Sequence, residues 1–118
     1  MRRSQRLYLQ DILERILHIE FCTASGRETF LEDKLLQDGV ILAFMIIGEA
    51  VKRLDTEMIE ACPEVVWSDY AGFRDVLIHR YHDILLEQVW LFSQEDIPAL
   101  KSAVTALLHN PDNSEAGT

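Results

Sequence analysis

Apolar residues recur at helical spacing along almost the whole chain. In the first segment, residues 4–22, they fall three or four positions apart and the charged residues lie between them. The apolar positions are Leu9, Ile12, Leu13, Ile16, Leu17 and Ile19, and the charged ones are Asp11, Glu14, Arg15 and Glu20. This pattern predicts an amphipathic helix that ends before Gly26.

A second helical pattern covers residues 29–54 and is expected to bend near Asp33 and Lys34. Its middle, "VILAFMIIGEA", is apolar on every side, and such a helix must be covered on more than one face. We expect a second copy of the chain to supply part of that cover. Gly39 and Gly48 lower helix propensity, so each is predicted to permit a close helix contact.

The second half of the chain contains shorter elements. Residues 55–67 form a connector with one short turn of helix, followed by a helix over 68–82 that Ser68 is expected to cap. Asp83 is expected to cap a further helix over 84–92. Ser93 and Asp96 resemble a capping box, which begins a last helix ending near residue 109.

No segment has the alternating pattern of a strand, so the sequence predicts an all-α bundle of about five helices. We expect one domain over residues 1–109. Residues 110–118 lack apolar side chains and are predicted to form a flexible tail.

Composition limits the possible functions of this 118-residue chain. Its 20 acidic and 11 basic residues give a net charge of −9, which argues against nucleic-acid binding through bulk charge but allows a local basic cleft. The two cysteines, Cys22 and Cys62, have no CxxC spacing, which is typical of reduced thiols in a cytosolic protein. The start lacks the apolar core of a signal peptide, and the longest apolar run, residues 40–47, is far shorter than a membrane span. We therefore expect a cytoplasmic protein.

The stretch "FRDVLIHRYH", residues 73–82, gathers two arginines and two histidines in this acidic chain. On a helix over 68–82, four apolar side chains form a stripe that faces the core, namely Tyr70, Phe73, Leu77 and Ile84. Arg74 lies at the edge of that stripe, and Tyr81 is expected only about 20° from it. Asp75, His79 and His82 face away from the core.

Three interpretations of this polar face are open. Charges on a surface helix are often only solvated. His79 and His82, three positions apart, could instead bind a metal, although no partner helix with further ligands is apparent. Alternatively, Arg74 could grip a phosphate while His79 carries protons, a combination that can cleave RNA without a metal by using the 2′-hydroxyl as nucleophile. These residues alone do not choose among the three.

"RDVLIHRY", from Arg74 to Tyr81, resembles the R-x4-H-x-Y motif of HepT-like toxins in the HEPN superfamily. The flanks strengthen the resemblance: "VVWSDYAGFRDVLIHRYHDILLEQVW" surrounds the motif, and "YLQDILERI", "LQDGVILAFMIIGEAVKRL" and "EDIPALKSAV" match the family in the same order. The resemblance covers about residues 7–108.

The resemblance implies an antiparallel helical bundle that dimerises, so that two motifs face one another across a cleft. It further implies a ribonuclease without a metal or other cofactor, a toxin whose RNA substrate could be tRNA or mRNA. The expected partner is a minimal nucleotidyltransferase antitoxin that transfers AMP to the motif tyrosine. Carried over, Arg74 and His79 are the catalytic pair and Tyr81 is the modification site.

Two carboxylates near the motif have open roles. Asp75 stands where relatives often have asparagine; it could orient His79, or it could repel the RNA phosphate. Glu49 is either a charge at the end of the bundle or a carboxylate that orients Arg74. Two other functions also stay open. One is a non-catalytic HEPN subunit that serves a nucleotidyltransferase, and the other is a structural helical adaptor.

Overall fold

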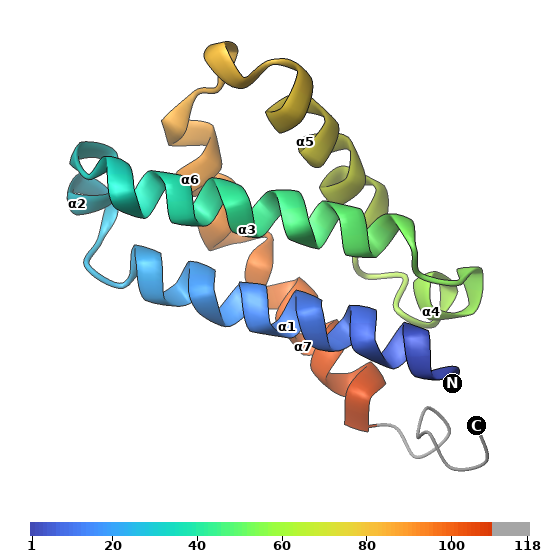
Figure 1. Ribbon diagram of the computed structural model, residues 1–118. Coiled ribbons are helices and arrows are strands. Elements are labelled where there is room, and N and C mark those ends of the chain that lie inside the picture. The colour runs from blue at the N-terminus through green and yellow to red at the C-terminus, as the bar shows by residue number, and fades with distance from the viewer. Residues whose placement is uncertain (110–118) are drawn as a thin grey trace.

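The apolar stripe of the N-terminal segment forms one long helix, as predicted. In the computed structural model, which describes residues 1–109, α1 spans Arg3–Thr23 and α3 spans Lys34–Lys52. The two helices lie side by side and run in opposite directions (Figure 1). The inward face of α1 consists of fully buried side chains, among them Leu9, Ile12 and Ile16. Burial of this stripe is the main force that holds α1 against α3.

The predicted bend near Asp33 is a complete break between two helices. α2 spans Arg27–Glu32 and α3 begins directly after Asp33, which leaves the helical conformation. The Asp33 carboxylate accepts hydrogen bonds from the backbone N–H groups of Leu35 and Leu36, at 2.9 and 3.3 Å. Asp33 therefore caps α3 and satisfies donors that have no partner within the helix.

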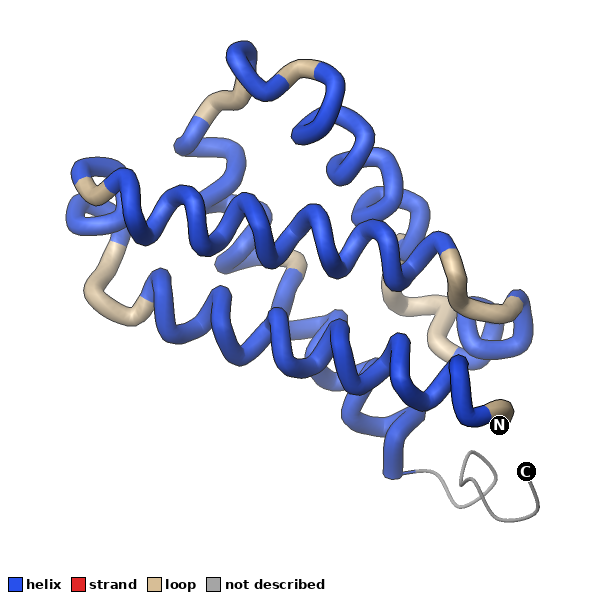
Figure 2. The backbone as a smooth tube through the Cα atoms, viewed as in Figure 1, coloured by secondary structure: helices blue, strands red, loops and turns tan. Residues whose placement is uncertain are grey.

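The remaining elements follow in short steps along the chain: α4 (Thr56–Ala61), α5 (Trp67–His79), a 3-10 turn η1 (Tyr81–Asp83), α6 (Leu86–Glu95) and α7 (Ile97–His109). Short loops connect them (Figure 2). Residues 1–109 contain no strand, so the predicted all-α class is confirmed. Five helices have ten or more residues, as expected, and α2 and α4 add two of six residues each. The predicted tail, residues 110–118, lies outside the described part.

The predicted start of α5 was wrong by a small but informative margin. The helix begins at Trp67, and Ser68 lies in its first turn without making a capping hydrogen bond. Trp67 is buried, and its indole Nε1 donates to the carbonyl oxygen of Cys62 at 3.1 Å. Burial of the indole, which a local capping rule does not consider, accompanies the start of this helix one residue earlier.

The next two predicted caps were also wrong. Asp83 closes η1, and α6 begins only at Leu86. Ser93 lies within α6, where it is buried and its hydroxyl donates to the Trp90 carbonyl oxygen at 2.6 Å. Because Ser93 satisfies its hydroxyl inside the helix, it is not available to start α7.

The apolar run of α3 is largely covered by the chain itself. Five of the eight residues from 40 to 47 are buried, whereas Leu42 is 50% exposed. α1 packs on one side of α3, and α5 and α6 pack on another. The expectation that a second copy supplies part of this cover is therefore limited to the exposed Leu42 and the half-buried Met45 and Ile46.

A cluster of aromatic rings joins α3, α5 and α6. Phe44 of α3 meets Phe73 and Phe92 edge to face, each with ring centroids 5.2 Å apart, and Tyr70 meets Phe92 at 5.1 Å. Phe73 and Phe92 stack at 4.9 Å. These contacts fix the orientation of α5, and with it the direction in which the polar face of α5 points.

Neither cysteine forms a disulfide within the described residues. Cys22 and Cys62 are both free and buried, and burial raises the pKa of both thiols, with a further contribution from Glu64 at Cys62. No helix within residues 1–109 combines the length and the continuous apolar character that crossing a bilayer requires.

Candidate active site

Gly48 brings α5 against α3 at the position of the motif arginine. A Cβ atom at residue 48 would lie 2.4 Å from the Cβ of Arg74 and 2.7 Å from the carbonyl oxygen of Tyr70. Both atoms belong to the body of α5, so no side-chain rotation could relieve the clash. The prediction that Gly48 permits close helix contact is confirmed. The contact places Arg74 beside Glu49, the residue that follows the glycine.

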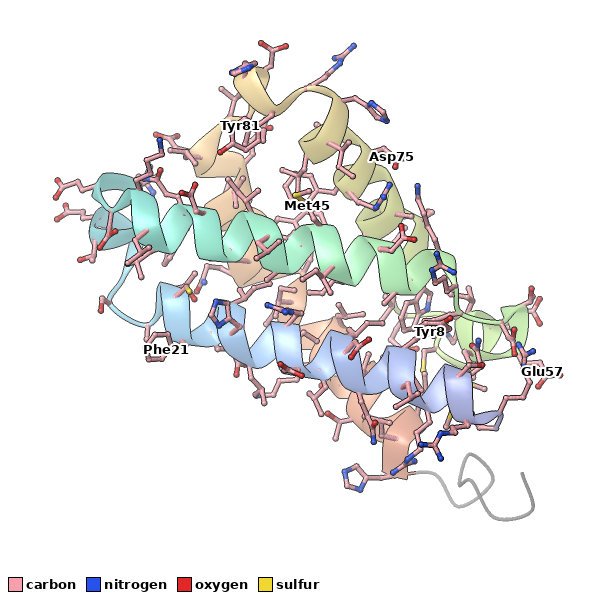
Figure 3. The ribbon with its side chains drawn as sticks, in the orientation of Figure 1. Tyr8, Phe21, Met45, Glu57, Asp75 and Tyr81 are labelled. Carbon is pink, nitrogen blue, oxygen red and sulfur yellow. The ribbon has the colours of Figure 1, made fainter. Side chains whose placement is uncertain are left out.

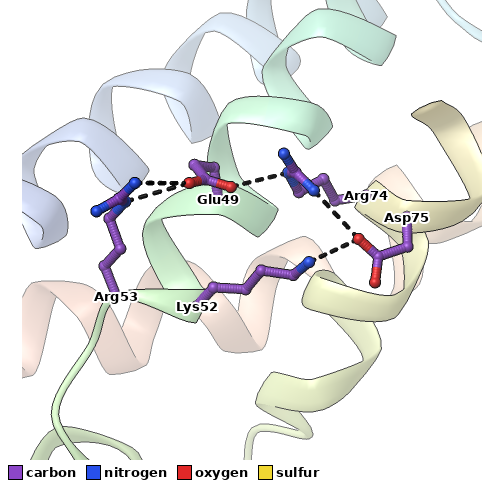
Figure 4. A network of polar contacts seen from close by, with 5 residues as sticks. All are labelled: Glu49, Lys52, Arg53, Arg74 and Asp75. Carbon is purple, nitrogen blue, oxygen red and sulfur yellow. Dashed lines mark hydrogen bonds and ion pairs between the residues drawn. The ribbon is translucent and has the colours of Figure 1, made fainter.

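Five charged side chains from α3 and α5 form one continuous network (Figure 4). Glu49 lies between two arginines: its Oε1 is 3.1 Å from Arg53 Nη2 and its Oε2 is 3.0 Å from Arg74 Nε. Asp75 Oδ1 is 3.1 Å from Arg74 Nη1 and 2.6 Å from Lys52 Nζ. The signs alternate along the network, and its three cations and two carboxylates leave one net positive charge.

Electrostatics keep Asp75 ionised. The hydrogen bond from Lys52 is the largest cause that holds the pKa of Asp75 below its ordinary value, and partial desolvation opposes it. The charge of Lys52 and the hydrogen bond from Arg74 act in the same direction as the Lys52 hydrogen bond. Because the folded-state pKa lies below the unfolded value, this contribution is present above the ordinary carboxyl range and is lost as pH falls through the lowered pKa. Exposure keeps its contribution to stability small.

Arg74 is held firmly and still has hydrogen-bonding capacity. Its side chain is 25% exposed, with Nε paired to Glu49 and Nη1 paired to Asp75. Nη2 donates no hydrogen bond within residues 1–109. This is the contact expected if Glu49 orients Arg74. A guanidinium fixed on two sides can present its remaining N–H groups to an anion without losing further conformational freedom.

His79 lies in different surroundings. It is the last residue of α5 and is exposed, and its side chain makes no hydrogen bond or ion pair within the described residues. It lies five positions after Arg74, which corresponds to about 140° around the helix and about 7.5 Å along it. The two motif residues therefore do not share one face of α5 within a single chain.

The predicted position of Tyr81 was wrong. The helix was expected to continue to residue 82, but it ends at His79, and Arg80 takes a non-helical conformation with φ −130° and ψ 38°. Tyr81 lies in η1, is 50% exposed, and its ring meets that of His82 edge to face at 5.9 Å. In Figure 3, Tyr81 lies near η1, whereas Asp75 lies on the opposite, outer side of α5.

The end of α5 also changes the argument for a metal site. His79 and His82 were considered because they would be three positions apart on one helix, but His82 lies in η1, beyond the helix end. In the described part of the chain, no three His, Cys, Asp or Glu side chains gather in a way that could hold a metal ion.

Sequence analysis missed two members of the network, Lys52 and Arg53. A signal for Arg53 was present, because it follows Glu49 by four positions, the spacing of helical ion pairs. Lys52 had no comparable signal. Its partner Asp75 is 23 residues away on another helix, and only the packing of α5 on α3 brings the two together.

Comparison with known proteins identifies the family. The model of the family described as "Ribonuclease HepT-like" matches residues 9–107, which include the whole network and the motif. The chain belongs to the ribonuclease HepT-like family. The family resemblance inferred from the motif is therefore confirmed, while the roles of the individual residues in this HepT-like chain stay predictions.

Several named proteins are similar to this HepT-like chain. "Probable ribonuclease HepT" of Thermococcus cleftensis is 43% identical over 102 residues, which cover 86% of this chain and 93% of that protein. "Gamma-glutamylcyclotransferase and putative RNase" of Methanocaldococcus jannaschii is 37% identical over 116 residues. That match covers 98% of this chain but only 52% of the relative, so the chain spans about half of its length. No solved structure matches the chain.

Proposed function

We propose that the chain is a metal-independent endoribonuclease toxin of the type VII (HepT/MNT) toxin–antitoxin class. Arg74 is the observation that carries the proposal: it is held by Glu49 and Asp75, is partly exposed, and donates no hydrogen bond from Nη2 within the described residues. An arginine held in this way is suited to grip a phosphate. Membership of the HepT-like family and the names of relatives support RNA as the source of that phosphate.

The proposed chemistry uses the 2′-hydroxyl of RNA as the nucleophile. Its oxygen forms a bond to phosphorus while the bond from phosphorus to the 5′-oxygen breaks. The products are a 2′,3′-cyclic phosphate and a 5′-hydroxyl end. One His79 accepts the proton of the 2′-hydroxyl, and a second His79 donates a proton to the departing 5′-oxygen. Arg74 stabilises the negative charge that builds up on the phosphate oxygens.

A dimer would provide the two histidines and explain the placement of the motif. Arg74 and His79 do not share a face within one chain, so a phosphate between two facing copies is the arrangement that lets both residues reach it. The outward face of α5 carries Gly72, Val76 and His79, all exposed. A Cβ at Gly72 would meet nothing within 4 Å, so the chain itself gives no packing reason for this glycine. Close approach of a second α5 would supply one.

Tyr81 is the proposed switch. In the antitoxin reaction, its phenolic oxygen would attack the α-phosphorus of ATP, forming an oxygen–phosphorus bond and releasing pyrophosphate, while the phenol proton passes to solvent. The half-exposed position of Tyr81 in η1 supports access by a modifying enzyme. Because Tyr81 lies beyond the end of α5, we expect the AMP group to block the RNA path at the helix end instead of occupying Arg74 directly.

One observation favours a second candidate function, a non-catalytic HEPN subunit that partners a minimal nucleotidyltransferase. Arg74 is held by two carboxylates, Glu49 and Asp75, which also reduce the positive potential that an RNA phosphate would meet. If those pairs do not yield to a phosphate, the chain would bind its partner without cutting RNA.

Incubation of the purified chain with RNA in excess EDTA tests the proposed function. We expect cleavage to persist and to yield 2′,3′-cyclic phosphate and 5′-hydroxyl ends, which end-specific labelling detects. His79→Ala should lose cleavage by a factor of about 10² or more while its circular dichroism spectrum stays unchanged. An inert wild-type chain would favour the non-catalytic subunit. Activity that EDTA abolishes and zinc restores would favour a metal site.

Mass spectrometry of the chain co-expressed with its cognate nucleotidyltransferase tests the switch. We expect added mass in units of AMP on the wild type and loss of its RNA cleavage. Tyr81→Phe should resist modification and still cut RNA, because the proposed chemistry does not use the phenol. AMP on another residue would contradict the assignment of Tyr81. An unmodified but fully inhibited complex would mean that the antitoxin acts by binding.

A further inference from the structure

We propose that Lys52 is a positioning residue of this site, and that it acts by engaging Asp75 so that Arg74 can bind the RNA phosphate. The inference rests on the proposed ribonuclease function. Lys52 is the last residue of α3, whereas Arg74 and Asp75 lie in the middle of α5, so the arrangement exists only in the folded chain.

A single oxygen atom carries the geometry. Asp75 Oδ1 accepts a hydrogen bond from Lys52 Nζ at 2.6 Å and another from Arg74 Nη1 at 3.1 Å. The shorter of the two comes from the lysine. Asp75 directly follows Arg74 in the chain, so the two backbones stay adjacent. The positive charge of Lys52 beside Asp75 cancels part of the negative potential that the carboxylate produces at Arg74, so Asp75 and Lys52 together attract Arg74 less than Asp75 alone would.

The charge balance of the network supports the same role for Lys52. With Lys52, the network of Glu49, Lys52, Arg53, Arg74 and Asp75 carries three cations against two carboxylates. Without Lys52 the balance is two against two, and Asp75 depends on Arg74 alone. Arg74 would then be neutralised by the carboxylate beside it, and the network would lose the net positive charge that attracts an approaching phosphate. Lys52 thus compensates the charge of the aspartate next to Arg74.

A double-mutant comparison tests this role. RNA cleavage is measured for the wild type, Lys52→Gln, Asp75→Asn and the double variant, at fixed salt. We expect Lys52→Gln to lower kcat/KM about fivefold, the effect of losing one exposed ion pair. The same lysine change in the Asp75→Asn chain should alter kcat/KM by less than about twofold, because the carboxylate that Lys52 engages is no longer present. Lys52→Arg should keep wild-type activity, because it keeps the cation.

Two further measurements separate this role from general destabilisation. Lys101→Gln is the matched control: Lys101 pairs with Glu20 at 3.0 Å and is about as exposed as Lys52, but it belongs to the contact between α7 and α1. It should leave kcat/KM unchanged. NMR titration should show that Lys52→Gln raises the pKa of Asp75, whereas Lys101→Gln does not.

Other outcomes would overturn the inference. An equal fall in kcat/KM in both backgrounds would mean that Lys52 contacts RNA itself. Unchanged activity in Lys52→Gln would mean that Asp75 does not compete for Arg74. The same four chains are also titrated with a 2′-deoxy analogue of the RNA, which binds but cannot be cut. If Lys52→Gln weakens binding of the analogue as expected, but the wild type cuts no RNA, only the proposed nuclease function fails. If Kd shows no such dependence, the role of Lys52 fails.

Discussion

The middle and the end of α5 differ in how much of the candidate site this chain builds by itself. In the middle, Arg74 packs against Gly48 and pairs with Glu49 and Asp75. The aromatic cluster holds this part of α5 against α3. At the end, His79 is exposed and has no polar partner within the described residues, and Tyr81 lies in a 3-10 turn after the helix has stopped.

In the proposed dimer, the two halves of the motif would depend on different parts of the assembly. Arg74 is pre-organised by the fold of one chain, and a fixed donor of this kind stabilises developing charge without reorganising first. His79 obtains no orientation from its own chain. In the proposed enzyme, a second copy or the RNA itself must orient the imidazole, and a modifying enzyme can reach the neighbouring Tyr81. Three predictions test this contrast.

Replacing the held arginine should produce the largest effect. We expect Arg74→Lys to lower RNA cleavage by a factor of about 100, because an ammonium group cannot bind Glu49 and Asp75 while also presenting a planar donor to phosphate. The stability change should stay within about 1 kcal/mol. Arg80→Lys is the control at the exposed end of α5 and should cost less than about threefold, since Arg80 has no carboxylate partner in the described part. Equal losses in kinetic assays would remove the contrast.

Disturbing the packing behind Arg74 should have an intermediate effect. We expect Gly48→Ala to destabilise the fold by about 1–3 kcal/mol, because the new Cβ would meet Arg74 Cβ and the Tyr70 carbonyl oxygen. Gly39→Ala is the matched control in the same helix. Its new Cβ would meet only side chains, with Cys22 Sγ at 3.0 Å and His18 Nε2 at 3.3 Å. Urea unfolding should show a smaller loss at Gly39, and RNA cleavage should fall only for Gly48→Ala.

The smallest effect should come from the outward face of α5. Alanine is a better helix former than glycine, so Gly72→Ala should stabilise an isolated chain by about 0.5–1 kcal/mol. If two α5 helices pack closely in the proposed dimer, the same change should weaken association, which sedimentation over a concentration series measures. A wild type that is monomeric at micromolar concentration would contradict the composite site. A variant that is more stable and dimerises normally would place the interface elsewhere.

The sequence by itself determined the fold class, most of the helices and the motif. The spacing of apolar residues reflects which face of a helix is buried, and each turn of α1 and α3 shows this spacing without reference to distant parts of the chain. The bend predicted near Asp33, which is a break in the structure, and the close contacts at Gly39 and Gly48 depend on equally local properties, namely capping chemistry and the missing Cβ. The R-x4-H-x-Y pattern was likewise readable from a single stretch of chain.

Only the tertiary structure decided where helices begin and end and which charges meet. At Trp67 and Ser93 the favourable capping residue of the sequence does not start the helix: Trp67 is buried one residue before Ser68, and the buried Ser93 donates its hydroxyl within α6. The end of α5 at His79 moved Tyr81 off the helix, which no periodicity could show. The pairing of Lys52 with Asp75 joins residues 23 positions apart. Such a contact depends on how closely two helices approach, and here the approach is set by Gly48 against the backbone of α5.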